Sequence, residues 1–265
     1  MVEADTPDEG DVPVEGDTPD VAGLAVDERT WRAALASQVA REKAHTRAGD
    51  ALAAARRRLP VTPVGEATVR GADGEIPFVD VFEGRRLLVV YAFMWNHGRP
   101  AAEQCPGCTF SVAQLPAQTY LSERDVTLAV LCEGAWPEIS AYRSIMGWTH
   151  PWYSTAQTGA VPAVIGEKYL RCYVRDAEQA YLTYETTDRG TEVMDPVLGL
   201  LDRTILGRQE TWEDSPDGWP QTVPGAWWRR DGRPVAQVER LSSAHPSPER
   251  PTLHTHGRNQ ACPRH

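Results

Sequence analysis

Two cysteines separated by two residues, Cys105 and Cys108, are the side chains of this sequence best able to do chemistry. They follow an apolar run at residues 87–95 and precede a segment with helical spacing, so we expect them at the N-terminus of a helix. Free backbone N–H groups and the positive end of the helix dipole stabilise a thiolate at such a position. The spacing therefore predicts that Cys105 is more nucleophilic at neutral pH than a free cysteine.

Thiol–disulfide exchange is the leading hypothesis for this pair. Cys105 would attack a disulfide and form a mixed disulfide, which Cys108, one helical turn later, would resolve. Pro106 at the start of the helix costs no backbone hydrogen bond, because that N–H would be unpaired in any case. We therefore predict an oxidoreductase or isomerase that requires no cofactor and acts on a protein or small-molecule disulfide or thiol. A non-catalytic interaction module, in which both thiols are inert, is a third class.

Metal binding by the same sulfurs is the alternative hypothesis. His97 stands in the loop before the dithiol, and His150 stands at the start of an expected strand. Two thiolates with one or two imidazoles can bind Zn²⁺ tetrahedrally, and soft sulfur ligands favour Cu(I). This alternative predicts a copper- or zinc-dependent enzyme, or a metal-binding protein, with Cys105, Cys108, His97 and His150 as ligands. Residues near the end of the chain could also scavenge metal, namely His254, His256, Cys262 and His265.

Aromatic residues surround the expected site. Most of them should pack in the core, but rings that face the dithiol would form an apolar pocket for a small metabolite. Arg99 and Glu103 could orient such a molecule. The candidate pocket residues are Tyr91, Phe93, Trp95, Trp148 and Trp152.

Apolar periodicity predicts the elements that must position these residues. Residues 27–59 indicate one long helix, or two helices broken near Gly49, with Pro60 as the stop. Residues 126–132 are a continuous apolar run, typical of a strand covered on both faces. The other expected elements are two short strands around a turn at 71–74, a strand at 87–95, a helix that breaks at Pro116, a helix at 136–146, a short strand at 148–153, a hairpin of 171–174 with 180–184, and a last helix at 194–201.

The order of these elements is that of a thioredoxin-like α/β fold: strand, dithiol, helix, strand, helix, hairpin, helix. A C-x-x-C pair next to a β-α-β pattern favours the same fold. Oxidoreductases of this fold also place a cis-proline opposite the dithiol, whereas no proline directly precedes the strand at Arg171, and Pro162 is the nearest. Cys172 in that strand could approach the dithiol or could be a small buried hydrophobe.

Composition divides the chain into four parts. Its 265 residues, 41% of them hydrophobic, suffice for one domain with tails. We expect a disordered acidic tail at 1–26, a helical arm at 27–60, a thioredoxin-like domain with a Trp- and Pro-rich C-terminal extension at 61–240, and a disordered tail at 241–265. The arm must pack either on the main domain or on a second subunit, so a homodimer formed through the arm is one expectation.

Charge and targeting signals exclude several classes of protein. Ten of the 37 acidic residues lie in residues 1–28, which contain no Lys or Arg, and this leaves 27 acids against 27 bases. A body so balanced offers no nucleic-acid or membrane surface. The sequence has no secretory signal and no membrane-spanning run, and its odd count of five cysteines argues against complete pairing. We therefore expect a cytoplasmic protein.

Several phrases of the chain match one family in the same order. Among them are Phe-Glu-Gly-Arg-Arg-Leu at 82–87, Cys-Pro-Gly-Cys at 105–108, Met-Gly-Trp-Thr-His-Pro-Trp at 146–152, Leu-Gly-Arg-Gln-Glu at 206–210 and Ala-Trp-Trp-Arg-Arg at 226–230. Shorter matches lie at 31–34, 41–43, 56–60, 93–94 and 173–176. On these phrases the chain resembles the bacterial thioredoxin-like family catalogued as domain of unknown function 899, from about residue 27 to residue 231.

This resemblance implies a thioredoxin-like fold and a dithiol site at Cys105 and Cys108. Members are labelled as dithiol–disulfide isomerases without a settled substrate, so the family implies a class of chemistry and no particular reaction. The chain departs from the family pattern in two places. The loop between Met94 and Cys105 is longer and carries His97, and His150 stands where Phe is more usual.

Overall fold

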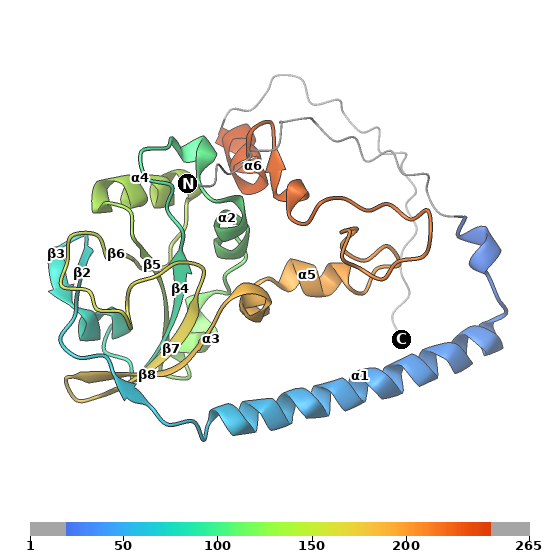
Figure 1. Cartoon of the computed structure of the whole chain (residues 1–265), viewed down its shortest axis with the longest axis horizontal. Coiled ribbons are helices and arrows are strands. Elements are labelled where there is room, and N and C mark those ends of the chain that lie inside the picture. The colour runs from blue at the N-terminus through green and yellow to red at the C-terminus, as the bar shows by residue number, and fades with distance from the viewer. Residues whose placement is uncertain (1–19, 245–265) are drawn as a thin grey trace, which may run out of the picture.

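The computed structural model describes residues 20–244, and a mixed sheet of eight strands forms its centre (Figure 1). The strands lie in the order β1-β8-β7-β4-β5-β6-β2-β3. Their bounds are β1 Thr62–Pro63, β2 Thr68–Gly71, β3 Gly74–Pro77, β4 Leu87–Phe93, β5 Val126–Cys132, β6 Trp152–Ser154, β7 Leu170–Asp176 and β8 Gln179–Thr186. A second, two-stranded sheet pairs β9 Arg229–Arg230 with β10 Arg233–Pro234.

The described residues form six α-helices, of which the first extends away from the sheet as a long rod (Figure 1). The α-helices are α1 Glu28–Arg56, α2 Pro106–Val112, α3 Gln118–Ser122, α4 Trp136–Met146, α5 Pro196–Leu201 and α6 Val235–Ala244. The 3-10 helices that matter below are η2 Phe78–Phe82, η4 Asp188–Met194 and η5 Ala226–Trp228.

Strand β4 is the centre of the topology. It pairs in parallel with β5, from Leu87 opposite Val126 to Phe93 opposite Cys132, and it pairs antiparallel with β7 on its other side. β7 and β8 form the expected antiparallel hairpin, and α2 follows β4. This order of strands and helices confirms the thioredoxin-like fold with an N-terminal helical arm.

Alternation along β4 assigns its side chains to two cores. Leu88 and Val90 belong to an apolar cluster on the side of η2. Tyr91 and Phe93 belong to a second cluster, which also contains both cysteines of the dithiol and the apolar face of α4. A strand that buries both faces must be apolar throughout, which explains why the sequence signal here was a continuous run.

Several predicted bounds are confirmed. β5 and α4 occupy the predicted residues, and Gly147 ends α4 with a left-handed φ of 65°. The helix after the dithiol breaks at Pro116, between α2 and α3, and residues 71–74 turn between β2 and β3.

Other predictions are wrong: β4 ends at Phe93 instead of residue 95, and α5 begins at Pro196 instead of residue 194. The strand expected from residue 148 begins only at Trp152, because Arg143 of α4 donates hydrogen bonds to the carbonyl groups of Trp148 and Thr149 and holds that stretch against the helix. The helix at 194–201 is not the last, since α6 follows at Val235–Ala244. Its Gln237 side chain is buried against Ala101 and Tyr142, so packing on the domain fixes a helix that its sequence only weakly predicts.

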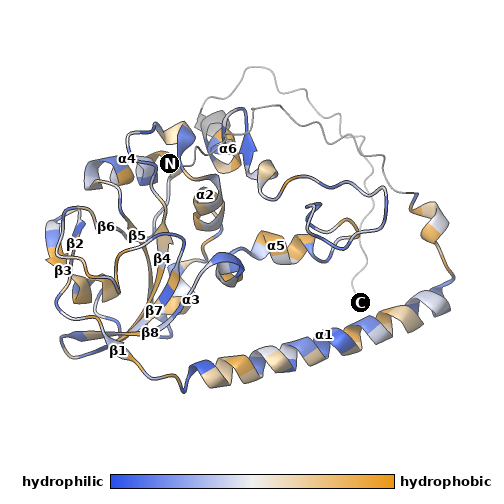
Figure 2. Ribbon diagram, viewed as in Figure 1, coloured by the Kyte–Doolittle hydropathy of each residue, from blue (hydrophilic) through white to orange (hydrophobic). Residues whose placement is uncertain are grey.

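Helix α1 is a single rod with no buried residue (Figures 1 and 2). Asp27 caps it by accepting hydrogen bonds from the N–H groups of Arg29 and Thr30, and Gly49 does not interrupt it. It meets the sheet at its C-terminal end, where the Arg56 guanidinium stands 5.2 Å from the ring centroid of Tyr184. The homodimer through this arm stays a prediction.

The predicted disordered tails lie largely outside residues 20–244, as do the four tail residues considered as metal ligands, His254, His256, Cys262 and His265. Within the described part of the chain, no helix has the length and apolar character needed to cross a bilayer.

We predict that deleting residues 1–57 changes the free energy of unfolding of the remaining domain by less than about 1 kcal/mol. The reason is that, within the described residues 20–57, α1 buries no residue and meets the sheet through the Arg56–Tyr184 cation–π pair, worth about 0.5–1 kcal/mol. Leu88→Ala, which empties a fully buried position of β4, should cost about 2–5 kcal/mol. Urea unfolding of both variants measures these values, and a large loss on deletion would show that the arm packs on its own domain.

Candidate functional site

The two cysteines lie at the N-terminus of α2, as predicted. Cys105 is the N-cap residue of α2, and its sulfur accepts a hydrogen bond from the Cys108 N–H at 3.2 Å. The Cys108 sulfur accepts one from the Met94 N–H at 3.4 Å. Both thiols are free. The first turn of α2 and the end of β4 therefore hold the two sulfurs from opposite sides.

The long loop before the dithiol is organised by Gln104, a fully buried side chain. Its Oε1 accepts a hydrogen bond from the Asn96 N–H at 2.9 Å, and its Nε2 donates to the carbonyl groups of Asn96 and Arg99. Arg229 of β9 donates to the Gln104 carbonyl, and Gln237 of α6 donates to the Ala101 carbonyl. The end of the described chain thus fixes the backbone that leads into Cys105.

The two thiols have opposite proton affinities. The hydrogen bond from the Cys108 thiol is the largest of the effects that lower the pKa of Cys105 to about 7. The Cys108 N–H and the charge of Lys168 lower it further, whereas burial raises it. Hydrogen bonding to Cys105, burial and the charge of Cys105 hold the pKa of Cys108 well above its ordinary value. At neutral pH the thiolate of such a pair is therefore on Cys105, which is about half ionised when the pH equals its pKa.

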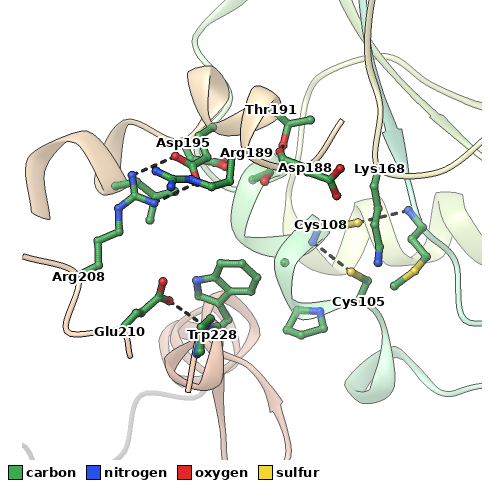
Figure 3. Close-up of a pocket in the computed structure, with 18 of the residues that line it drawn as sticks. Cys105, Cys108, Lys168, Asp188, Arg189, Thr191, Asp195, Arg208, Glu210 and Trp228 are labelled. Atoms are coloured by element: carbon green, nitrogen blue, oxygen red, sulfur yellow. Dashed lines mark hydrogen bonds and ion pairs between the residues drawn. The ribbon is translucent and has the colours of Figure 1, made fainter. Parts of the chain in front are cut away.

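Lys168 stands opposite the dithiol, just before β7, where a proline would be expected in an oxidoreductase of this fold (Figure 3). Its backbone N–H donates to the Ala92 carbonyl of β4, and its φ of 58° lies in the left-handed region. A non-glycine residue held there is strained, and such strain is concentrated at functional sites.

The dithiol opens onto a cavity of about 730 Å³ (Figure 3). One wall is formed by Tyr91 and Met94 of the sheet side and by the first turns of α2. The opposite wall comes from residues 188–228, which we call the cover segment. The cover residues that line the cavity are Asp188, Arg189, Thr191, Glu192, Asp195, Leu198, Arg208, Glu210, Trp212, Pro224, Gly225 and Trp228.

Trp228 of the cover segment packs on the middle of the C-P-G-C motif (Figure 3). A Cβ on Gly107 would lie 2.8 Å from Trp228 Cζ3, which is closer than carbon atoms can approach. The indole also stacks on Phe110 of α2, with ring centroids 5.3 Å apart. Glycine at position 107 is therefore required by the cover segment. The exposed fractions that result are 5% for Cys105 and 2% for Cys108.

Buried charges hold the cover segment in shape. Arg208 donates two hydrogen bonds to Glu192 and two to Asp202, which ties η4 to the loop after α5. Glu210 accepts hydrogen bonds from the indole N–H groups of Trp212 and Trp227 and from the Gly225 N–H. Both side chains are buried and fully paired, so they are structural parts of the cavity wall.

Asp195 is the unpaired carboxyl of this wall. It is 5% exposed, and its Oδ1 has no hydrogen-bond partner within the described structure. Burial raises its pKa to about 6, against a smaller lowering by the Ser111 hydroxyl. A buried carboxyl with one oxygen left unpaired costs stability, and a cavity that keeps one is a candidate for function.

The structure does not bring the histidines to the dithiol. His97 is exposed on its loop, while the buried His150 places its Nε2 2.9 Å from the Pro116 carbonyl oxygen. Among residues 20–244 no three His, Cys, Asp or Glu side chains are grouped so that they could hold a metal ion. The proposed copper or zinc set of Cys105, Cys108 and the two histidines thus finds no geometric support in this part of the chain.

Of the five aromatic residues predicted to line a pocket, only Tyr91 lines the cavity. The others pack against one another in the core: the ring centroids of Trp148 and Trp152 are 5.5 Å apart in a stacked pair, and Phe93 and Trp95 are buried beside Tyr142. Neither Arg99 nor Glu103 lines the cavity, and both form an exposed ion pair. Cys172 lies in β7 opposite Val89 and Tyr184, away from the cavity wall.

Sequence reasoning missed Lys168, Asp195 and Trp228. Lys168 carries no motif and is one of only two lysines in the chain, Lys43 being the other. Trp228 did carry a signal, because it lies in the phrase Ala-Trp-Trp-Arg-Arg that the family resemblance singled out.

Comparisons with known proteins place this geometry in context. The sequence model of the family described as "Bacterial protein of unknown function (DUF899)" matches residues 22–233. No match was found among curated proteins. Two solved structures are similar in part. A yeast mitochondrial 1-Cys peroxiredoxin, described for its thiol resolving mechanism, is 15% identical, with 55% of this chain and 78% of that chain covered and a TM-score of 0.33. A thioredoxin from Wuchereria bancrofti is 16% identical, with 50% and 88% covered and a TM-score of 0.30.

We predict that alkylation of Cys105 by iodoacetamide depends on pH with an apparent pKa of about 7. In Cys108→Ala this apparent pKa should rise toward the ordinary thiol value of about 8.5, because the hydrogen bond from the Cys108 thiol is lost while that from the Cys108 backbone N–H remains. Peptide mapping identifies the alkylated residue. An unchanged profile in the variant would contradict this origin of the thiolate.

Asp195→Asn should make the protein more stable above pH 6. The folded pKa of Asp195, about 6, exceeds the unfolded value of about 3.9, so the wild type loses stability as pH rises through this interval and does not regain it above. The neutral amide does not titrate, and the difference between the two proteins should vanish below about pH 4. Chemical unfolding at a series of pH values measures this difference, and a variant less stable at pH 8 would refute the assignment.

Proposed function

The chain belongs to the bacterial family of unknown function DUF899, and from this premise we propose that it catalyses thiol–disulfide exchange through Cys105 and Cys108. One observation carries the proposal: the sulfur of Cys105 accepts the Cys108 N–H at the start of α2 and faces a cavity that a substrate can enter. A thiolate so placed is a stabilised yet available nucleophile.

The reaction proceeds in two displacements. The Cys105 thiolate attacks one sulfur of a substrate disulfide, which forms a protein–substrate disulfide and releases the first substrate thiolate. The Cys108 thiol then loses its proton and attacks Cys105, which forms the Cys105–Cys108 disulfide and releases the second thiolate. The substrate gains two electrons and the protein dithiol loses two. An external dithiol returns the protein to its reduced state.

The depressed pKa of Cys105 and the raised pKa of Cys108 support this division of roles. The attacking thiol must be ionised at rest, whereas the resolving thiol needs to ionise only after the mixed disulfide has removed the negative charge on Cys105. Free thiols of this kind also favour a reducing, cytoplasmic location.

Metal binding remains the second candidate, and the described residues give it less support. The two cysteines could serve as two ligands, but both histidines of the predicted set lie elsewhere. Elemental analysis of untagged full-length protein separates the two functions, since exchange requires no stoichiometric metal.

We predict that Cys105→Ser abolishes the reduction of small disulfides, because the nucleophile is removed. Cys108→Ser should retain the first displacement and accumulate one covalent substrate adduct on Cys105, because nothing resolves it. Intact-mass spectrometry after reaction with one equivalent of disulfide measures both outcomes. Cys132→Ser is the matched control, since this buried thiol has its pKa raised by burial and lies outside the cavity wall. Failure of Cys108→Ser to form an adduct on Cys105, or an equal yield of adduct on Cys108 in Cys105→Ser, would refute the assigned roles.

A further inference from the structure

We propose that the substrate of this site is a small disulfide that carries a carboxylate near its sulfur, of the amino-acid or short-peptide type, and that Lys168 binds this carboxylate. This inference rests on the proposed function and adds to it the chemical class of the molecule.

Enclosure decides the size of the substrate. The exposed fraction of the nucleophilic residue is 5%, and Trp228 lies against Gly107 in the middle of the motif, so a folded protein cannot present its disulfide in line with Cys105. The cavity of about 730 Å³ is instead within the range of pockets that bury a small molecule, about 300–1,000 Å³. Hydrogen bonds of the buried Arg208 and Glu210 side chains hold the cover segment in place as one wall of this cavity.

The cationic side chains of the cavity wall indicate which substituent the substrate carries. Within residues 20–244, three cations line the cavity: Lys168, Arg189 and Arg208. Arg208 is saturated by Glu192 and Asp202, and Arg189 forms an ion pair with Glu192 while its guanidinium stands 4.3 Å from the ring centroid of Trp212. No carboxylate of the described residues pairs with Lys168, whose exposed ammonium is near enough to Cys105 to lower its pKa.

The position of Lys168 limits where the anionic group sits. Lys168 and Cys105 line the same cavity, and the Lys168 side chain extends toward the dithiol (Figure 3), so a carboxylate that meets the ammonium must be only a few bonds from the sulfur under attack. An α-carboxylate on the carbon next to a CH₂–S group satisfies this condition. The buried Asp195 carboxyl on the opposite wall, whose Oδ1 lacks a partner, supplies a further polar group at the same cavity.

The apolar part of the wall suits the rest of such a molecule. Met94, Leu198 and Trp228 line the cavity around the sulfurs and can pack on the CH₂–S–S–CH₂ unit. In the exchange, the Cys105 thiolate bonds to one substrate sulfur, the other leaves as a thiolate that takes a proton from solvent, and Cys108 then displaces the first half. Two molecules of substrate thiol and one protein disulfide result.

The test compares two small disulfides, cystine and cystamine, which differ only by the carboxylates. Single-turnover rate constants are measured for reduced full-length protein with each, and their ratio is divided by the same ratio for 2-mercaptoethanol, an uncharged thiol, to remove intrinsic reactivity. We expect wild type to favour cystine about tenfold, Lys168→Gln to lose this preference, and Lys168→Glu to reverse it. Lys43→Gln, on the exposed face of α1, is the matched control and should behave as wild type.

The ratio separates binding from nucleophilicity, because a higher pKa of Cys105 in Lys168→Gln slows both disulfides alike. An unchanged ratio in Lys168→Gln would overturn the inference and leave the proposed exchange intact, as would reduction of insulin as fast as cystine. If Cys105 reacted with none of the three disulfides, the proposed function itself would fail and the substrate class with it.

Discussion

The first turn of α2 is the constraint on which the site depends. Its leading amide points at the Cys105 sulfur, and a hydrogen bond of 3.2 Å from Cys108 holds a charge that would otherwise be costly at 5% exposure. The turn also needs a residue without a side chain at position 107, because Trp228 packs where a Cβ on Gly107 would be. The first turn of α2 therefore both stabilises the thiolate and leaves room for Trp228 of the cover segment to pack against it.

Two parts of the molecule enclose this turn: the central sheet with the segment before β7, and the cover segment. The sheet β4-β5-β7-β8 supplies the rigid end of β4, while the backbone of Lys168 hydrogen-bonds across to Ala92 beside it. The cover segment closes the other side through Arg208 and Glu210, each buried and satisfied by several partners. The cover segment makes the dithiol part of the wall of a cavity.

The scaffold and the dithiol could be predicted from the sequence because both are local signals. A continuous apolar run predicted β5, and the glycine at position 147 predicted the end of α4. Two thiols before a helical segment predicted the cap of α2. The cavity could not be predicted, because Lys168, Asp195 and Trp228 come from three segments that only the tertiary structure brings together. The aromatic residues close to the motif in sequence were the natural candidates for its wall, yet most of them are needed to fill the core beneath the sheet. The phrases at 206–210 and 226–230 matched a family without an assigned role, and the structure explains them as the hydrogen-bonded parts of the cover segment.

We propose that Cys105 and Cys108 act as one two-electron couple inside this cavity. The most direct measurement is peptide mapping by mass spectrometry of reduced wild-type protein after reaction with one equivalent of cystine, together with quantification of the cysteine released. We expect a disulfide between Cys105 and Cys108 and two cysteines released per protein, with Cys132 and Cys172 still free. A persistent cysteine adduct on Cys105 without the internal disulfide, or both thiols unchanged, would contradict it.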